Sequence, residues 1–263
     1  MAQSKAFVDT TILAEVLLKT GPTHDAAERA LLRYTHTLLP VYAIKEWKRG
    51  QFAKYVYIHN QLKRTGSFSA TNIALSRLFM RPRWQSTAFE AVAVTTLRLP
   101  SAPTTPVPPD TELADRFRLA FKTLIYLSWD SRRSVTSETV MDLDCYVESG
   151  PRDQVNGEID IHPRDCRGDQ ECCLAKKLRK DKDALLKLRN AIPPNGRQED
   201  ARRREALKKL AVHQNSRFER RDCQALGDAY FALFAPMDAD ILTTNVKDHV
   251  PLAAALGKTA VAP

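Results

Sequence analysis

The sequence has no apolar run long enough to cross a membrane as a helix. Its 263 residues include no stretch of about 18 consecutive apolar residues, the length that an ordinary membrane-spanning helix needs. The first residues, MAQSKAFVDTTILAEVLL, are polar and then amphipathic, so they lack the continuous apolar block of a secretory signal peptide. These absences predict a cytoplasmic protein without a membrane partner.

Paired cysteine motifs and glycine-rich loops are missing as well. The cysteines are odd in number and show no paired CxxC spacing, which argues against a disulfide scaffold and against structural zinc. They are interpreted as buried or loop thiols: Cys145, Cys166, Cys172, Cys173 and Cys223. The histidines show no metal-ligand spacing, and the absence of a glycine-rich phosphate loop gives no support for ATP dependence.

Basic residues are abundant but unevenly distributed. The formal net charge is +9, and the segment from Lys176 to Arg221 alone contains 16 Lys and Arg against 6 Asp and Glu. The rest of the chain carries 24 basic and 25 acidic residues and is therefore nearly neutral. A confined block of positive charge favours a nucleic-acid partner, because contacts to phosphates release counterions. The alternative is a solvated helical face.

The N-terminal part of the chain is expected to begin with a strand and then to become helical. The strand ends at Asp9 and the following helix at Gly21, and helical periodicity is seen over residues 23–40. More helices are expected after Pro40, over residues 41–66, 70–78 and 84–97. A stiff connector with five prolines follows at residues 100–109.

The C-terminal part is expected to change from helices to an alternating pattern. An amphipathic helix starts near Thr111, residues 150–172 are irregular, and two basic helices are separated by IPPNG. From about residue 221 the order is helix, strand, helix, strand. Since the first strand and the last strands need each other to make a sheet, we expect residues 1–65 and 221–263 to form an α/β core. The mainly helical segment 66–220 is then an insertion.

Four acidic residues lie where an open parallel sheet could gather them: Asp9, Glu46, Asp228 and Asp248. Like charges cluster in a low-dielectric site only when a cation neutralises them. Oxygen-rich sites of this kind suit Mg²⁺ or Mn²⁺, which polarise phosphoryl oxygens and acidify water. Other acids near these positions, Asp222, Asp238 and Asp240, are expected to lie on another helix face or at the opposite end of the strand.

The four acids occur in FVDTT, IKEW, GDAYFALFA and ILTTNVKDH, and in this order the chain resembles the PIN domain nucleases. The most specific match is the Thr-x-Asn-x-x-Asp stretch that runs from Thr243 through Asn245 to Asp248. The resemblance implies a three-layer α/β/α core with a small central parallel sheet. It also implies that Asp9, Glu46, Asp228 and Asp248 bind Mg²⁺ or Mn²⁺ and support hydrolysis of phosphodiester bonds, with RNA favoured over DNA.

Accessory roles in this site are assigned to neighbouring polar residues. The hydroxyl of Thr10, Thr243 or Thr244 is in a position to orient a metal-bound water, and Asn245 belongs to the same stretch. The chain departs from the family pattern in the long separation of Glu46 and Asp228, and Asn245 stands where many members have an acid. The alternative is therefore a PIN-like nucleic-acid-binding or scaffold protein without catalytic activity.

The basic segment supplies the candidate nucleic-acid contacts. The sequence RRREALKK places five basic residues on one helix, where they are expected to present charge along one side: Arg202, Arg203, Arg204, Lys208 and Lys209. The alternative is that this helix docks on a protein partner or on another copy of the chain.

Overall fold

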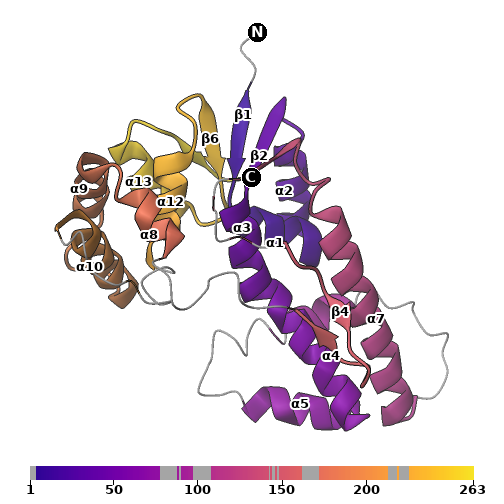
Figure 1. Ribbon diagram of the computed structural model, residues 1–263. Coiled ribbons are helices and arrows are strands. Elements are labelled where there is room, and N and C mark those ends of the chain that lie inside the picture. Colours follow the sequence, from indigo (N-terminus) through magenta and orange to yellow (C-terminus); the bar gives the residue numbers. More distant parts are fainter. Residues whose placement is uncertain are drawn as a thin grey trace.

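A five-stranded sheet lies at the centre of the computed structural model (Figure 1). The structure describes residues 4–77, 88, 90–96, 108–141, 143, 146, 148–161, 172–212, 218 and 225–263. The strands of the sheet are β1 (Lys5–Val8), β2 (His36–Pro40), β3 (Glu138–Val140), β6 (Ala239–Leu242) and β7 (Ala260–Val261). They are all parallel and lie in the order β3-β2-β1-β6-β7. The expected α/β class with a central parallel sheet is confirmed.

Helices flank the sheet and account for most of the remaining described chain. They are α1 (Thr10–Leu18), α2 (Pro22–Leu31), α3 (Val41–Trp47), the π-helical turn η1 (Lys48–Phe52), α4 (Ala53–Thr65), α5 (Phe68–Ser76), α7 (Asp110–Ser131), α8 (Cys173–Leu178), α9 (Lys182–Ala191), α10 (Gln198–Val212), α12 (Gly227–Phe234) and α13 (Val246–Ala255). A hairpin of β4 (Arg152–Asp153) and β5 (Ile159–Asp160) packs on α4. Within the described residues, no helix combines the length and apolar character that crossing a membrane requires.

The strand order creates a point where the chain changes direction across the sheet. From β1 the chain adds β2 and β3 on one side, and it later returns to place β6 and β7 on the other side. In open parallel sheets, ligands bind outside the carboxyl ends of the strands at such a switch point. The loops that follow β1 and β6 are therefore the first place to look for a site.

The structure differs from the expected elements at two strands. Residues 36–40 form β2 and pair with β1, although their sequence continues a helical periodicity. Strand β3 pairs with β2 and comes from within residues 66–220, so the segment expected to be an insertion contributes to the central sheet. Both strands are short, and pairing rather than local sequence pattern determines them.

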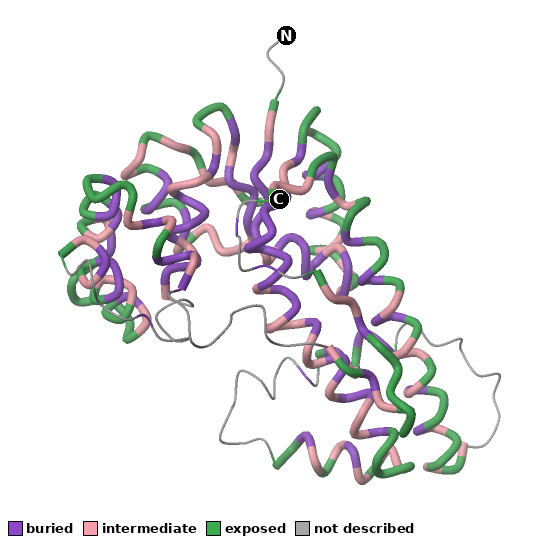
Figure 2. Tube along the Cα trace, viewed as in Figure 1, coloured by how far each residue is buried: buried purple, intermediate pink, exposed green. Residues whose placement is uncertain are grey.

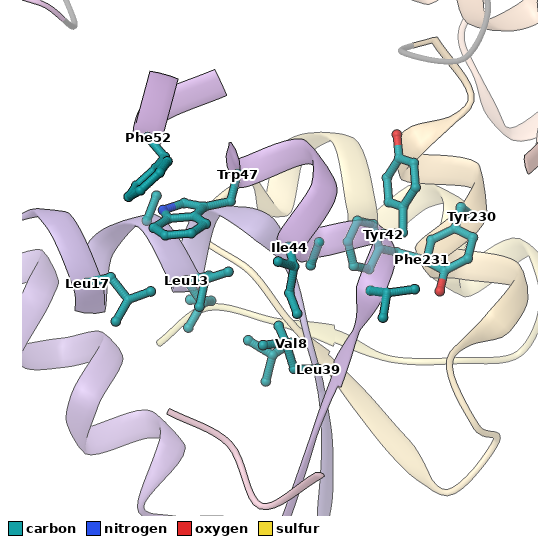
Figure 3. Close-up of a cluster of buried hydrophobic side chains, with 14 of the residues drawn as sticks. Val8, Leu13, Leu17, Leu39, Tyr42, Ile44, Trp47, Phe52, Tyr230 and Phe231 are labelled. Carbon is teal, nitrogen blue, oxygen red and sulfur yellow. The ribbon is translucent and has the colours of Figure 1, made fainter. Parts of the chain in front are cut away.

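The middle of the chain also contributes to the main core. Trp47 and Phe52 are fully buried with ring centroids 4.5 Å apart, and Trp129 of α7 stacks on Trp47 at 6.4 Å. Figure 3 shows Trp47 and Phe52 on one side of this core and a second aromatic group on the other. Figure 2 shows buried residues along the central strands and α3. Segments from both expected units thus share one hydrophobic core.

Several expectations concern residues that the structure does not describe. These include residues 84–87 of one helix, most of the proline-rich connector, Asp222, Cys145, Cys166 and Cys223. Residues 90–96 of the same helix are helical, as expected. Cys172 and Cys173 are disulfide-bonded in the structure, so the expectation that they are thiols is wrong, although Cys172 is buried.

Candidate functional site

Asp9 is fixed at the carboxyl end of β1, where it caps α1. Its Oδ1 accepts a hydrogen bond of 2.7 Å from the backbone N–H of Thr10. Its Oδ2 accepts hydrogen bonds of 2.7 Å from the hydroxyls of Thr11 and Thr243. The side chain is nearly inaccessible, with Asp9 only 3% exposed. A buried carboxylate therefore joins the end of β1 to the end of β6.

Glu46 reaches the same place from α3, the helix that follows β2. Its Oε2 accepts a hydrogen bond of 2.7 Å from the hydroxyl of Thr10. The pKa of Glu46 is raised to about 7, first by burial and then by the negative charges of Asp9 and Asp228, while the Thr10 hydrogen bond and His249 lower it. The three carboxylates are therefore close enough to repel one another.

Asp228 begins α12 next to a glycine that allows close packing. A Cβ at Gly227 would lie 2.6 Å from the hydroxyl oxygen of Tyr42, so a larger residue there would collide with α3. The Tyr42 ring packs on Tyr230 (Figure 3), and their ring centroids are 4.7 Å apart. Burial, together with the charges of Glu46, Asp228 and Asp9, raises the pKa of the Tyr42 hydroxyl well above its usual range. This contact sets the distance between the helices that carry Glu46 and Asp228.

His249 of α13 lies between two of the acids. Its Nε2 is 3.3 Å from Oδ1 of Asp228 and 3.7 Å from Oδ2 of Asp9, and the residue is 1% exposed. Burial lowers the pKa of His249, but the hydrogen bond with Asp228 and the charge of Asp9 outweigh it and raise the pKa overall. Among the described residues, its Nδ1 has no hydrogen-bond partner. When protonated, His249 partly neutralises these two acids.

Arg203 of α10 also contacts the acids. Its guanidinium forms salt bridges with Oδ2 of Asp228 and with Oδ2 of Asp248, the latter at 3.0 Å, and lies 3.4 Å from Asp200. The Arg203 side chain is only 13% exposed. Two acids expected to bind metal are thus paired with an arginine that was expected to bind nucleic acid.

Asp248 is held entirely by groups that donate hydrogen bonds. Oδ1 is paired with the guanidinium of Arg197, and Oδ2 accepts bonds of 3.0 Å from Arg203 and from the side-chain amide of Asn245. Burial opposes ionisation, yet these hydrogen bonds hold the pKa of Asp248 well below its usual range. Asp248 is therefore ionised and fully satisfied.

The structure places the other candidate residues in different environments. The side chains of Thr10 and Thr243 support the acids, whereas Thr244 contributes its backbone N–H to the Thr11 hydroxyl at 3.0 Å. Asp238 pairs with Lys5 and Asp240 with Tyr34, both near the amino end of the sheet. These two acids lie away from the site, as expected.

The five basic residues of RRREALKK do not lie on one exposed side. Arg203 faces the acids, and Arg204 donates to the carbonyls of Arg189 and Ile192 at 3.1 and 2.5 Å. Lys209 lies 4.6 Å from the centre of the Phe218 ring. Arg202 and Lys208 are exposed. The expectation of a common charged side is wrong because three of the five have partners within the fold.

The donor chemistry of the site suits a hard divalent cation, but the side chains are not arranged around one. Carboxylates at the end of β1 and on α3 and α12 converge, and the pKa of Glu46 is raised first by burial and then by the negative charges of Asp9 and Asp228. Within the described part of the chain, no group of three or more His, Cys, Asp or Glu side chains has the arrangement that would hold a metal ion. Arg203 supplies positive charge instead, and Nε2 of His249 lies 3.3 Å from Oδ1 of Asp228.

The fold and the site define an α/β protein with an acidic cluster at the carboxyl edge of a doubly wound parallel sheet. Beyond this class, comparison gives no relative: no protein-family model, curated protein or solved structure matches the chain.

Sequence reasoning missed several residues of the site. Thr11, which binds Asp9, lies directly after the expected Asp9–Thr10 pair, and its position in the first helical turn was a usable signal. His249 contacts two of the acids, although the histidines show no metal-ligand spacing in the sequence. Arg197 and Asp200 carried no signal, because only the folded chain brings them to Asp248 and Arg203.

Proposed function

We propose that the protein is a divalent-cation-dependent endonuclease with a PIN-like α/β/α core, and that RNA is its favoured substrate. The observation that carries the proposal is the convergence of Asp9, Glu46 and Asp228 at the carboxyl edge of the sheet. Burial and mutual repulsion raise the pKa of Glu46 to about 7. A cation relieves that repulsion, which gives the site an affinity for Mg²⁺ or Mn²⁺.

The residues that would hold the cation are Asp9, Glu46 and Asp228, joined by Asp248 when it is released from its arginines. When bound, the cation polarises a phosphoryl oxygen and acidifies water. The chain supplies the orientation: the Thr10 hydroxyl fixes Glu46, and the hydroxyls of Thr11 and Thr243 fix Asp9. His249 holds a proton at Nε2 beside Asp9 and Asp228.

The confined positive charge supports a nucleic-acid substrate. The segment from Lys176 to Arg221 contains 16 Lys and Arg against 6 Asp and Glu, and Arg202 and Lys208 are exposed on α10. Because α10 also delivers Arg203 to the acids, a phosphate backbone bound along α10 would pass beside the carboxylates. Such a path would bring scissile bonds near the proposed metal site.

The direct test is a cleavage assay with end-labelled single-stranded RNA and DNA, in Mg²⁺ or Mn²⁺ and with a chelator. We expect cation-dependent internal cleavage by the wild-type protein and its loss in Asp9→Asn. Asp240→Asn is the matched control, because Asp240 lies in β6 but bonds Tyr34 near the other end of the sheet. Full activity of Asp9→Asn in saturating Mn²⁺ would refute the proposal.

A second candidate is a PIN-like nucleic-acid-binding or scaffold protein that performs no chemistry. The observation favouring it is that Arg203 and Arg197 already satisfy Asp228 and Asp248. On this view the salt bridges are permanent parts of the fold, and the protein binds nucleic acid or a partner chain without cleaving anything. The absence of any Mn²⁺ effect on the wild-type protein would favour this candidate.

A further inference from the structure

The arginine that neutralises the acids belongs to an outer helix of the fold. Helix α10 packs on α9, and α9 in turn packs on α12 and α13 (Figure 1). The site itself lies on β1, α3, α12 and the start of α13. Arg203, together with Arg197 just before α10, reaches back to Asp228 and Asp248. The positive charge on Arg203 and Arg197 therefore comes from a segment that lies outside the central sheet.

Arg203 and a divalent cation cannot both use the same carboxylate oxygens. Oδ2 of Asp228 and Oδ2 of Asp248 are paired with Arg203, and Oδ1 of Asp248 with Arg197. We propose that Arg203, assisted by Arg197, is an internal cation that competes with a divalent metal for Asp228 and Asp248. This inference rests on the proposed function and adds a regulatory step to the same site.

The remaining contacts of α10 allow Arg203 to leave without unfolding the helix. Ala206, Leu207 and Leu210 are buried. Arg204 separately fixes the helix to the carbonyls of Arg189 and Ile192. The salt bridges of Arg203 are therefore only one of several contacts that hold α10 on the fold. When they break, α10 stays in place and the acids are able to bind a cation instead.

The released guanidinium has a natural second partner in the proposed substrate. Arginine binds phosphate oxygens through two parallel hydrogen bonds, as it binds a carboxylate. When phosphates bind Arg203 and Arg197, Asp228 and Asp248 become available to bind metal. Metal bound to these two acids likewise releases the arginines. Substrate and metal should therefore assist each other's binding, and without nucleic acid the metal site should be weak.

The test measures Mn²⁺ binding to the metal-free full-length protein by isothermal titration calorimetry, without nucleic acid. Arg203→Gln should bind Mn²⁺ at least about tenfold more tightly than the wild type does, which is within the usual range of coupling between sites. Arg202→Gln is the matched control, because it removes the same charge from an exposed position on the same helix. It should bind like the wild type. Arg203→Lys keeps the charge but loses the planar fork, and should lie between them.

The outcomes separate this inference from the proposed function. If Arg203→Gln and Arg202→Gln bind Mn²⁺ alike, or Arg203→Gln binds it more weakly, the competition does not exist, although the metal site stands. If neither the wild type nor any variant binds Mn²⁺, both proposals fail. Circular dichroism verifies folding, and if the Gln variant does not fold, Arg203→Lys must still bind Mn²⁺ more tightly than the wild type.

Discussion

Arg203 lies 3.0 Å from Asp248, and 45 residues of sequence separate the two side chains. This contact joins the basic helix α10 to the acidic site at the edge of the sheet. Both side chains are largely buried and belong to a network that also includes Arg197 and Asp228, so removing either partner is more costly than losing an exposed salt bridge. The charges that looked like a nucleic-acid surface and a metal site in the sequence are thus parts of one arrangement.

Glu46 should make the stability of the metal-free protein fall as pH rises. Its pKa is about 7 in the fold against an ordinary value of 4.5, so the folded chain binds this proton more tightly than the unfolded chain does. The free energy of unfolding therefore declines between about pH 4.5 and 7, by about 3 kcal/mol. In Glu46→Gln this decline should be absent, and at pH 8 the free energy of unfolding of the variant should rise relative to that of the wild type. Urea unfolding with a chelator checks this.

The control for Glu46 is Glu138→Gln, which removes an exposed carboxylate from β3. It should keep the pH dependence of the wild type. An unchanged pH dependence in Glu46→Gln would contradict the proposed repulsion among the acids.

Thr243→Val should destabilise the fold by removing a donor from Asp9. The Thr243 hydroxyl donates to Oδ2 of Asp9 at 2.7 Å and accepts from the backbone N–H of Asn245 at 2.9 Å, all in a buried setting. Losing these bonds should cost about 1–3 kcal/mol. Thr244→Val is the control, since Thr244 enters the site through its backbone, and it should cost less than about 0.5 kcal/mol. Equal losses in the two variants would refute this role of Thr243.

Gly227→Ala should separate the helices that carry Glu46 and Asp228. The added Cβ would lie 2.6 Å from the Tyr42 hydroxyl oxygen. Overpacking of this kind costs about 1–3 kcal/mol. Gly50→Ala, where a Cβ meets nothing within 4 Å, should be neutral or stabilising. Differential scanning calorimetry compares the two, and a melting temperature of Gly227→Ala equal to that of the wild type would mean that the packing is looser than described.

Arg202 and Lys208 should account for the salt-sensitive nucleic-acid contacts of α10. Each phosphate contact contributes about 0.7 to 0.9 to the slope of log affinity against log salt. The double change Arg202→Gln, Lys208→Gln should flatten the slope by up to about 1.8, in all sequences alike. Arg204→Gln should instead lower stability, because it loses the carbonyls of Arg189 and Ile192. If the double variant leaves the slope unchanged but releases a bound protein or a second copy of the chain, α10 is a protein-docking helix.

Local sequence predicted the parts of the fold whose pattern is strong. Asp9 after an apolar strand, the long amphipathic α7, and the final order of α12, β6, α13 and β7 all appear where they were expected. Strand β2 was missed because its residues follow a helical periodicity that continues past the real end of α2. Strand β3 is only three residues long, and no sequence pattern indicates that it pairs with β2.

The candidate site was predicted as a set of acids but not as an electrostatic arrangement. Sequence order suggested Asp9, Glu46 and Asp228, and the charges of Asp9 and Asp228 do act on Glu46. It could not reveal that Arg203 and His249 lie against these acids, because those contacts depend on how α10 and α13 pack. The number of basic residues in a segment does not specify which of their side chains are exposed to solvent and which form salt bridges with carboxylates.

The most direct measurement of the central claim is the thermal unfolding of the wild type and Asp228→Asn with and without saturating Mn²⁺. The account predicts that Mn²⁺ raises the melting temperature of the wild type by about 5–10 °C, as binding well above the dissociation constant does for a chain of this size. Asp240→Asn should show the same rise and Asp228→Asn little or none. An equal rise in Asp228→Asn and the wild type, or no rise in the wild type, would contradict a metal site built on these acids.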